Sequence, residues 1–332
     1  MAIFAKHKHI GMKNTTELIK IINDRLAAVE YPRGSASPAG LYKPIEYTLE
    51  GGGKRLRPVL TMAAASALGL EPEAVVNQAA GIEMFHNFTL IHDDVMDRSP
   101  RRRGKLTVYR RWDERRAILS GDALLTMATQ MMMLGAGDRT ADILDIFNAT
   151  AMLVYEGQQY DIEFENRATV SEKAYLHMIC LKTSVLLGGA CKIGAAMAGA
   201  SDEVREAFYQ FGMKLGLAFQ LRDDWLDIYG DKAVFGKAIG NDIITGKRTW
   251  FYVIADHESH DRLAEAFAIE PGNRRVAVVR ALYDRLHLSE RCDRLIDRYI
   301  DESLAALDCV GMNAGTRRWF EDLAHSQSRR VR

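Results

Sequence analysis

The stretch VREAFYQFGMKLGLAFQLRDDWLDIYGD, residues 204–231, indicates the fold class of the protein. Its apolar residues recur at intervals of three and four positions, which is the spacing of one face of an α-helix. The stretch AILSGDALLTMATQMMMLGA, residues 117–136, has the same spacing. Runs with the period-2 alternation of strands between turn residues are missing from the sequence. We therefore predict an all-α, multi-helix protein that is nearly all helical from about residue 116 onward.

The prolines support this interpretation, because six of the seven fall at or before residue 100 and leave little to interrupt later helices. Residues 31–58 are expected to form a loop, a short helix and a second loop that carries a basic cluster. The sequence contains no repeat of solenoid period and no low-complexity linker. We predict a single domain over residues 1–332.

The composition excludes several classes of protein. Of the 332 residues, 48% are hydrophobic and 27% are charged, as in ordinary globular proteins. Lysine plus arginine and aspartate plus glutamate both total 44, so no overall basic field attracts nucleic acid or an anionic membrane. The four cysteines lack metal-site or disulfide spacing and are expected to be buried thiols. Without a signal-like start or an apolar run of membrane length, we expect a cytoplasmic protein with no membrane span.

Two short acidic motifs stand out in apolar, helical surroundings: DDVMD from residue 93 and DDWLD from residue 223. Residues four apart lie on one face of a helix, so the first and last aspartates of each motif are neighbours. Like charges so placed destabilise a helix unless a cation lies between them. One such motif is often only a solvated acidic face; two copies, together with basic motifs, favour metal binding. The six aspartates are Asp93, Asp94, Asp97, Asp223, Asp224 and Asp227.

Carboxylates without histidine or cysteine partners favour Mg²⁺, which completes its coordination with water and substrate phosphate. The sequence also supplies cations to bind such phosphates. GGGKRLRP carries Lys54, Arg55 and Arg57 after three glycines, and Arg102 and Arg103 follow the first acidic motif closely. Guanidinium groups bind phosphate oxygens in bidentate fashion. Further candidates are Lys182 and Thr183 in LKTS, Gln220 in FQLRDD, and Lys237, Asp242, Lys247 and Thr249 in GKAIGNDIITGKRT.

These motifs together resemble the trans-isoprenyl diphosphate synthase (polyprenyl synthetase) family over nearly the whole chain. The pieces that carry the resemblance are, in order, GGKRLRP, HNFTLIHDDVMD, RRG, EGQQYDIEFE, LKTS, FQLRDDWLDIYGD and GKAIGNDIITGKRT. The resemblance implies the isoprenoid synthase fold, in which helices surround a deep central cavity and two aspartate motifs face each other across its mouth. It also implies a homodimer and three Mg²⁺ ions per active site.

The implied reaction is the head-to-tail (1'-4) condensation of isopentenyl diphosphate with dimethylallyl, geranyl or farnesyl diphosphate. The product would be a short-chain trans-prenyl diphosphate, farnesyl or geranylgeranyl diphosphate. The allylic substrate would ionise to a carbocation, the alkene of isopentenyl diphosphate would attack it, and a proton would leave to the departed diphosphate.

The resemblance also assigns roles to individual residues. Asp93, Asp97 and Asp223 are implied as direct Mg²⁺ ligands, with Asp94, Asp224 and Asp227 completing the metal-binding set. The isopentenyl diphosphate site is implied at Lys54, Arg57, His86 and Arg103, and the allylic diphosphate site at Arg102, Lys182, Lys237 and Lys247. Thr183 and Gln220 join Lys182 as catalytic residues, because their oxygen dipoles stabilise the cation without trapping it.

His86 is weighed on its own, because a lone histidine on an amphipathic helix is often only structural. It lies seven positions before Asp93, which is two turns away on the same face, and this favours a substrate contact. His92, beside the aspartates, is interpreted as a structural or supporting residue.

The residues one turn before the first motif, Phe88 and Thr89, are expected to set the product length. A bulky ring at position 88 resembles the short-chain enzymes and would stop elongation near fifteen or twenty carbons; alternatively, Phe88 simply packs in the core. The two-residue spacing inside DDVMD, where many bacterial short-chain enzymes have four, does not decide between lengths.

Four other functions are alternatives: a longer-chain polyprenyl diphosphate synthase, a metal-dependent phosphohydrolase, a class I terpene cyclase and a non-catalytic partner subunit of a prenyl synthase. A phosphohydrolase leaves the second acidic motif and the GKRLRP loop unexplained. Terpene cyclases typically carry a different second metal motif, and partner subunits tend to lose a motif that this chain retains. The C-terminal SQSRRVR either closes over the diphosphate or is frayed.

Overall fold

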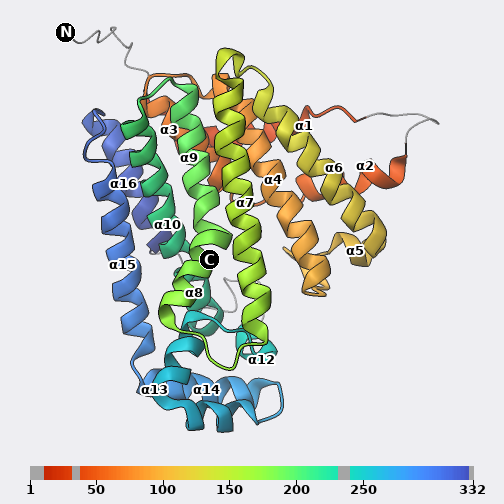
Figure 1. Ribbon diagram of the computed structural model, residues 1–332, viewed down its shortest axis with the longest axis vertical. Coiled ribbons are helices and arrows are strands. Elements are labelled where there is room, and N and C mark those ends of the chain that lie inside the picture. Colours follow the sequence, from red (N-terminus) through yellow and green to blue (C-terminus); the bar gives the residue numbers. More distant parts are fainter. Residues whose placement is uncertain (1–10, 32–37, 231–239, 329–332) are drawn as a thin grey trace. The chain divides into compact units, whose positions relative to one another are not determined.

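The computed structural model describes residues 11–31, 38–230 and 240–328, and this part of the chain is almost entirely helical (Figure 1). The prediction of an all-α protein is confirmed. The first elements are α1 (Thr15–Ala27), α2 (Ala39–Leu49), α3 (Leu56–Ala67), the 3₁₀ turn η1 (Pro72–Val75), α4 (Val76–Met96), β1 (Arg101–Arg102), β2 (Lys105–Leu106), α5 (Val108–Arg111), α6 (Glu114–Met133) and the 3₁₀ turn η2 (Gly137–Arg139).

The second part of the chain contains long helices interrupted by one π-helical turn. Its elements are α7 (Thr140–Glu165), α8 (Glu172–Ile179), the π-helical turn η3 (Cys180–Ser184), α9 (Val185–Met197), α10 (Asp202–Tyr229), α12 (Asn241–Thr245), α13 (Trp250–Phe267), α14 (Asn273–Arg285), α15 (Leu288–Ala306) and α16 (Ala314–Ser328). The two strands β1 and β2 form an antiparallel hairpin. Each strand is too short for an alternating apolar and polar pattern to be recognised in the sequence.

The chain divides into two compact units, and each is described by itself. Unit 1 comprises residues 1–148, 189–209 and 312–316; unit 2 comprises residues 149–188, 210–311 and 317–332. The prediction of one domain over the whole chain stays a prediction.

Unit 1 is built around α4, which contacts α1, α2, α3, α5 and α6. Figure 1 shows α4 (orange) and α6 (yellow) side by side. One glycine on each helix permits their close approach. A Cβ at Gly81 of α4 would lie 2.6 Å from Met132 Cε, and a Cβ at Gly121 of α6 would overlap the ring of His92. This packing holds the first acidic motif, at the end of α4, in a fixed position.

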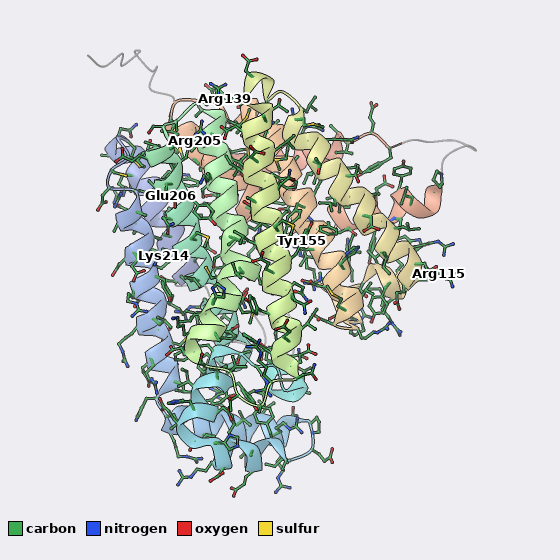
Figure 2. The ribbon with its side chains drawn as sticks, viewed as in Figure 1. Arg115, Arg139, Tyr155, Arg205, Glu206 and Lys214 are labelled. Atoms are coloured by element: carbon green, nitrogen blue, oxygen red, sulfur yellow. The ribbon has the colours of Figure 1, made fainter. Side chains whose placement is uncertain are left out.

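In unit 2, α13 packs against α8 and α14, and α14 packs against α15. The rings of Phe251 and Tyr283 contact each other in this core, with centroids 5.7 Å apart. Lys214 of α10, labelled in Figure 2, forms an ion pair of 2.6 Å with Glu302 of α15. These contacts fix the helix that carries the second acidic motif.

One helical stretch in the described chain, Glu172–Met197, is long and apolar enough to cross a membrane by length and composition alone. Its most apolar window is 78% buried within the protein, which is typical of a core helix.

Candidate active site

The basic loop of unit 1 lies between α2 and α3 and is shaped by its glycines. Gly52 and Gly53 adopt φ values of 71° and 137°, which side-chain-bearing residues rarely adopt. A Cβ at Gly53 would lie 2.8 Å from the guanidinium of Arg103, which donates a hydrogen bond to the carbonyl of Gly52. The structure therefore brings Arg103 and the GGGKR loop together, although they are about fifty residues apart in sequence.

A buried ion pair anchors this loop to α4. Arg55, at the N-cap of α3, has a φ of 50°, and its Nη1 lies 2.6 Å from Oε1 of Glu83. Only 5% of Arg55 and 2% of Glu83 are exposed, and a second guanidinium nitrogen donates to the carbonyl of Leu49 at 2.8 Å. Burying both charges is tolerable because they are paired and hydrogen-bonded. Arg55 was predictable from the sequence as one of the loop cations, whereas Glu83 belongs to no motif.

His86, three residues after Glu83 on α4, contacts Arg57 through Nε2 and Nη1 at 3.1 Å. Arginine only donates hydrogen bonds, so Nε2 of His86 accepts and the ring hydrogen is on Nδ1. Burial, with further contributions from Arg57, Arg103 and Arg102, holds the pKa of His86 well below its usual value of 6.5. His86 therefore offers a neutral N–H donor.

The first acidic motif lies where α4 ends. Asp97 is the C-cap of the helix, and its N–H donates to the carbonyl of Asp93 at 2.8 Å, so these two residues are one turn apart as predicted. Asp94, which is buried, accepts bonds from Nε and Nη2 of Arg102 at 2.9 and 2.8 Å. Arg102 lies on β1, the first strand of the hairpin that follows the motif.

The two residues expected to control product length lie on the same helix. Phe88 is 6% exposed, and its ring contacts His92 and Phe85 with centroids 4.7 and 5.6 Å apart. Nε2 of His92 lies 3.2 Å from the carbonyl of Ile118 on α6. The hydroxyl of Thr89 donates to the carbonyl of His86 at 2.8 Å. Phe88 is thus held between other rings.

In unit 2, the π-helical turn Cys180–Ser184 carries Lys182 and Thr183. A π-helical turn is often found at a functional site, since it changes the direction of its side chains. Two glycines accommodate it: a Cβ at Gly157 of α7 would overlap the backbone of Lys182, and one at Gly216 of α10 would lie 2.5 Å from Cα of Ser184. No sequence pattern predicted this turn.

Lys182 forms an ion pair with Asp161 of α7 at 2.6 Å. Burial raises the pKa of Asp161, but the charges of Lys182 and Lys247 outweigh it, so that the pKa lies below its usual value. Asp161 is part of the EGQQYDIEFE segment but had no predicted role. An isolated acid in a helical segment carries no signal of its partner, so the sequence did not reveal this ion pair.

The second acidic motif lies in the last turns of α10. Asp227 accepts a hydrogen bond from the backbone N–H of Asp242 at 3.0 Å. Asp224 is 3% exposed and accepts bonds from Tyr175 Oη, Gln220 Nε2 and the N–H of Trp250, the last two at 3.0 and 3.3 Å. Burial raises the pKa of Asp224 to about 7; the bond from Tyr175 counteracts this and the charge of Asp242 adds to it.

Trp250, for which the sequence offered no interpretation, donates hydrogen bonds from both its backbone and its side chain. Its backbone N–H binds Asp224, and its Nε1 donates to Glu172 of α8 at 2.9 Å. Gln220 links the motif to the π-helical turn, because its Oε1 lies 3.1 Å from the hydroxyl of Thr183.

The predicted site residues thus form one group in each unit. In unit 1, three residues predicted for the isopentenyl diphosphate site lie around the basic loop: Arg57, His86 and Arg103. In unit 2, Lys182, Thr183 and Gln220 lie near Asp224. Lys237 lies outside the described residues. The opposition of the two acidic motifs across a cavity stays a prediction.

The carboxylates suit a hard cation that substrate helps to bind. In the described chain, no group of three or more His, Cys, Asp and Glu side chains is arranged to hold a metal ion by itself. Mg²⁺ usually takes only one or two protein carboxylates and completes its octahedron with water and phosphate oxygens. The oxygen-only donor set therefore fits Mg²⁺ bound together with a diphosphate.

The fold and the site define an all-α protein with two aspartate motifs and clustered basic residues. The chain belongs to the polyprenyl synthetase family, whose sequence model matches residues 38–286, and it is a prenyltransferase. Members of this family use isopentenyl diphosphate and allylic diphosphates.

Individual relatives agree with this assignment. The geranylgeranyl diphosphate synthase of Methanosarcina mazei is 42% identical over 231 residues, which are 69% of this chain and 71% of that one. A crystal structure of a geranylgeranyl pyrophosphate synthase superposes with a TM-score of 0.89 at 36% identity, covering 96% of this chain and 99% of that chain. The polyprenyl synthase of Caulobacter crescentus, complexed with calcium and isoprenyl diphosphate, has a TM-score of 0.82 at 31% identity and covers 96% and 94%.

Proposed function

We propose that the protein condenses isopentenyl diphosphate with an allylic diphosphate, head to tail, and releases geranylgeranyl diphosphate and diphosphate. The observation that carries the proposal is the π-helical turn, which bears the cation of Lys182 and the uncharged hydroxyl of Thr183. The amide oxygen of Gln220, on α10, lies next to that hydroxyl. A cation suits a leaving diphosphate, and oxygen dipoles that are poor nucleophiles suit an allylic carbocation. The relatives named as geranylgeranyl diphosphate synthases support the twenty-carbon product.

We assign the metal ligands to Asp93, Asp97 and Asp223, which would hold Mg²⁺, three ions per site, with Asp94 and Asp227 in support. When bound, the Mg²⁺ ions neutralise the negative charge that develops on the leaving diphosphate. The calcium found with isoprenyl diphosphate in the Caulobacter protein supports a divalent cation at such a site.

The residues of the chain perform the remaining tasks. Lys182 and Lys247, with Arg102 and Lys237, bind the allylic diphosphate and orient its C–O bond for ionisation. Lysine ammonium groups that stabilise the departing charge lower the barrier to this step. The ion pair between Lys182 and Asp161 holds the ammonium in place before substrate arrives.

The second diphosphate is assigned to Lys54, Arg57, His86 and Arg103. His86 donates from Nδ1 to a phosphate oxygen while Arg57 supplies the charge. The alkene of isopentenyl diphosphate attacks the cation, and the proton lost from the adduct passes to the departed diphosphate. Water must be excluded from the reaction, because it would convert the cation to an alcohol.

Product length is assigned to Phe88, whose ring would end the cavity. The experiment combines purified protein, Mg²⁺, labelled isopentenyl diphosphate and, in turn, dimethylallyl, geranyl or farnesyl diphosphate. We expect a twenty-carbon product from wild type and longer products from Phe88→Ala. Phe320→Ala, which removes a buried ring of α16 that packs against Phe211, is the matched control and should retain the wild-type length.

Each outcome has a distinct meaning. Unchanged length in Phe88→Ala would place the end of the cavity elsewhere, and wild-type products of fifteen or of more than twenty carbons would correct the assigned length. No condensation with any starter would support a non-catalytic partner subunit. Release of orthophosphate from a diphosphate substrate without condensation would support a phosphohydrolase.

We also infer a homodimer in the cytoplasm, formed through α6. This helix exposes three large apolar side chains, since Ile118 is 41%, Leu119 59% and Met133 41% exposed. Exposed apolar groups clustered on one helix are typical of a protein interface. Arg115, at the start of the same helix, extends into solvent (Figure 2).

A further inference from the structure

Asp224 uses both of its carboxylate oxygens inside unit 2. Oδ2 accepts the hydroxyl of Tyr175 from α8 and the backbone N–H of Trp250 from α13, and Oδ1 accepts Nε2 of Gln220. The side chain is nearly inaccessible to solvent, as the residue is 3% exposed. Three donors from three helices therefore surround the second aspartate of the motif, which the sequence resemblance had grouped with the metal ligands.

These bonds dictate how Gln220 is oriented. In its ionised form the Asp224 side chain only accepts hydrogen bonds, and that form requires Gln220 to turn its NH₂ group toward Oδ1. Its Oε1 consequently lies toward the hydroxyl of Thr183, 3.1 Å away. Since an amide oxygen cannot donate, the hydroxyl donates to it. The chain of bonds thus has a single direction, from Thr183 through Gln220 to Asp224.

We infer that Asp224 is a positioning residue, not a metal ligand, and that it fixes the polarity of Gln220 and Thr183. The inference rests on the proposed function, in which these two side chains stabilise the allylic cation. With the observed polarity, the amide hydrogens are drawn away from Thr183 and both oxygens retain lone pairs for a cation. With the reverse polarity, Gln220 would direct N–H groups, which carry partial positive charge, toward Thr183 and would destabilise the same cation.

The doubled aspartate thereby has two separate tasks. Asp223 is assigned to the metal, whereas Asp224, on a different face of α10, is fixed by donors inside the unit. Residues one apart on a helix do not share a face, which makes such a division geometrically natural.

The isosteric change Asp224→Asn tests the polarity directly. The N–H of Trp250 is a backbone donor and cannot reverse, so the oxygen of the new amide must remain on that side. Its NH₂ group then faces Gln220, which must rotate and present its own NH₂ group to Thr183. We expect kcat to fall roughly 10- to 100-fold, comparable to or less than the loss of one oxyanion-hole donor.

Other kinetic constants separate positioning from metal binding. In Asp224→Asn, KM for both diphosphates and the Mg²⁺ concentration for half-maximal rate should stay within about twofold of wild type. Asp223→Asn should raise that Mg²⁺ concentration. Asp293→Asn is the matched control, because Asp293 pairs with Arg222 of α10 at 2.8 Å and undergoes the same chemical change outside the site. It should retain the wild-type kcat.

The possible outcomes are distinct. A raised Mg²⁺ requirement in Asp224→Asn, like that of Asp223→Asn, would make Asp224 a metal ligand, and a wild-type kcat would exclude the polarity effect; either result overturns the inference. If Asp224→Asn does not unfold cooperatively, Asp224→Ser takes its place, because serine removes the buried charge and cannot orient the amide of Gln220. We expect the same fall in kcat and the same unchanged Mg²⁺ dependence. Absence of condensation by wild type would instead reject the proposed function, and the inference with it.

Discussion

At the scale of the residue, His86 shows how the fold selects one form of a side chain. Arg57 occupies its Nε2 acceptor, and burial together with four nearby arginines lowers its pKa. A protonated ring would place a fifth positive charge beside them and would break the bond from Arg57. The neutral ring adds a hydrogen-bond donor to a cationic site without adding charge repulsion.

This state of His86 predicts a pH dependence of stability. The folded pKa lies below 6.5, so as pH falls through 6.5 the unfolded chain gains a proton that the folded chain does not. The free energy of unfolding therefore decreases on acidification, by up to about 1.4 kcal/mol per pH unit, until the folded pKa is reached; above 6.5 the contribution is absent. We expect His86→Gln to lose less stability than wild type between about pH 7.5 and 5.5 in urea titrations.

The same substitution at exposed His257 controls for the loss of a histidine. Equal losses of stability on acidification in wild type and His86→Gln would show that His86 takes up its proton in the folded state.

Single residues were predictable from the sequence when the pattern itself expressed their chemistry. Examples of such predictable residues are the aspartates spaced four apart, the cations that follow the glycines, and His86, two turns before Asp93. Glu83 and Asp161 were not identified, because an isolated acid in a helix says nothing about its partner. Their partners, Arg55 and Lys182, are 28 and 21 residues away in sequence. Only the folded chain shows that these pairs position the cations that the pattern did reveal.

At the scale of the element, the π-helical turn depends on the two glycines that face it. Gly157 leaves room for the backbone of Lys182, and Gly216 leaves room for Ser184. A side chain at either position would force α7 or α10 away from the turn that carries Lys182 and Thr183.

We therefore predict that Gly157→Ala lowers both stability and activity. Overpacking of this kind costs about 1–3 kcal/mol, and any shift of the turn displaces Lys182 from the diphosphate. Thermal unfolding and kcat on the same preparation provide the measurement. Gly311→Ala is the matched control: a Cβ there meets nothing within 4 Å, and both quantities should stay near wild type. An active, fully stable Gly157→Ala would mean that the turn tolerates displacement.

The helices themselves followed from the apolar spacing, and the structure confirms an all-α chain. The π-helical turn did not follow, because one extra residue in a buried apolar helix leaves the local composition unchanged. The β1–β2 hairpin was equally unpredictable, since two-residue strands are too short for alternation to appear. In both cases tertiary contacts select the local geometry.

At the scale of the whole molecule, the proposed homodimer gives a prediction about association. Leu119, 59% exposed on α6, would be buried at the interface, and a charge there would be desolvated without a partner. We expect Leu119→Asp to run as a monomer in light scattering at concentrations where wild type is a dimer. Val278→Asp, at an apolar residue on α14 that is 39% exposed, is the matched control and should leave the mass unchanged. A dimeric Leu119→Asp would move the interface away from this helix.

The family was recognisable from the sequence because its motifs occur together and in order over nearly the whole chain. The match over residues 38–286 and the superposition with TM-score 0.89 confirm that recognition. Oligomeric state was not derivable in the same way, because the sequence does not show which apolar side chains of α6 remain exposed in the folded chain. Product length was not derivable either, since it depends on how far one ring, Phe88, extends into a cavity.

The buried pair of Arg55 and Glu83 has a thermodynamic consequence for ligand recognition. Because the pair fixes the glycine-rich segment within the fold itself, the conformational entropy of ordering that segment is lost during folding and not during association. A loop that had to become ordered on contact would weaken each encounter by that amount. At the proposed diphosphate site, binding would therefore carry no cost of loop ordering.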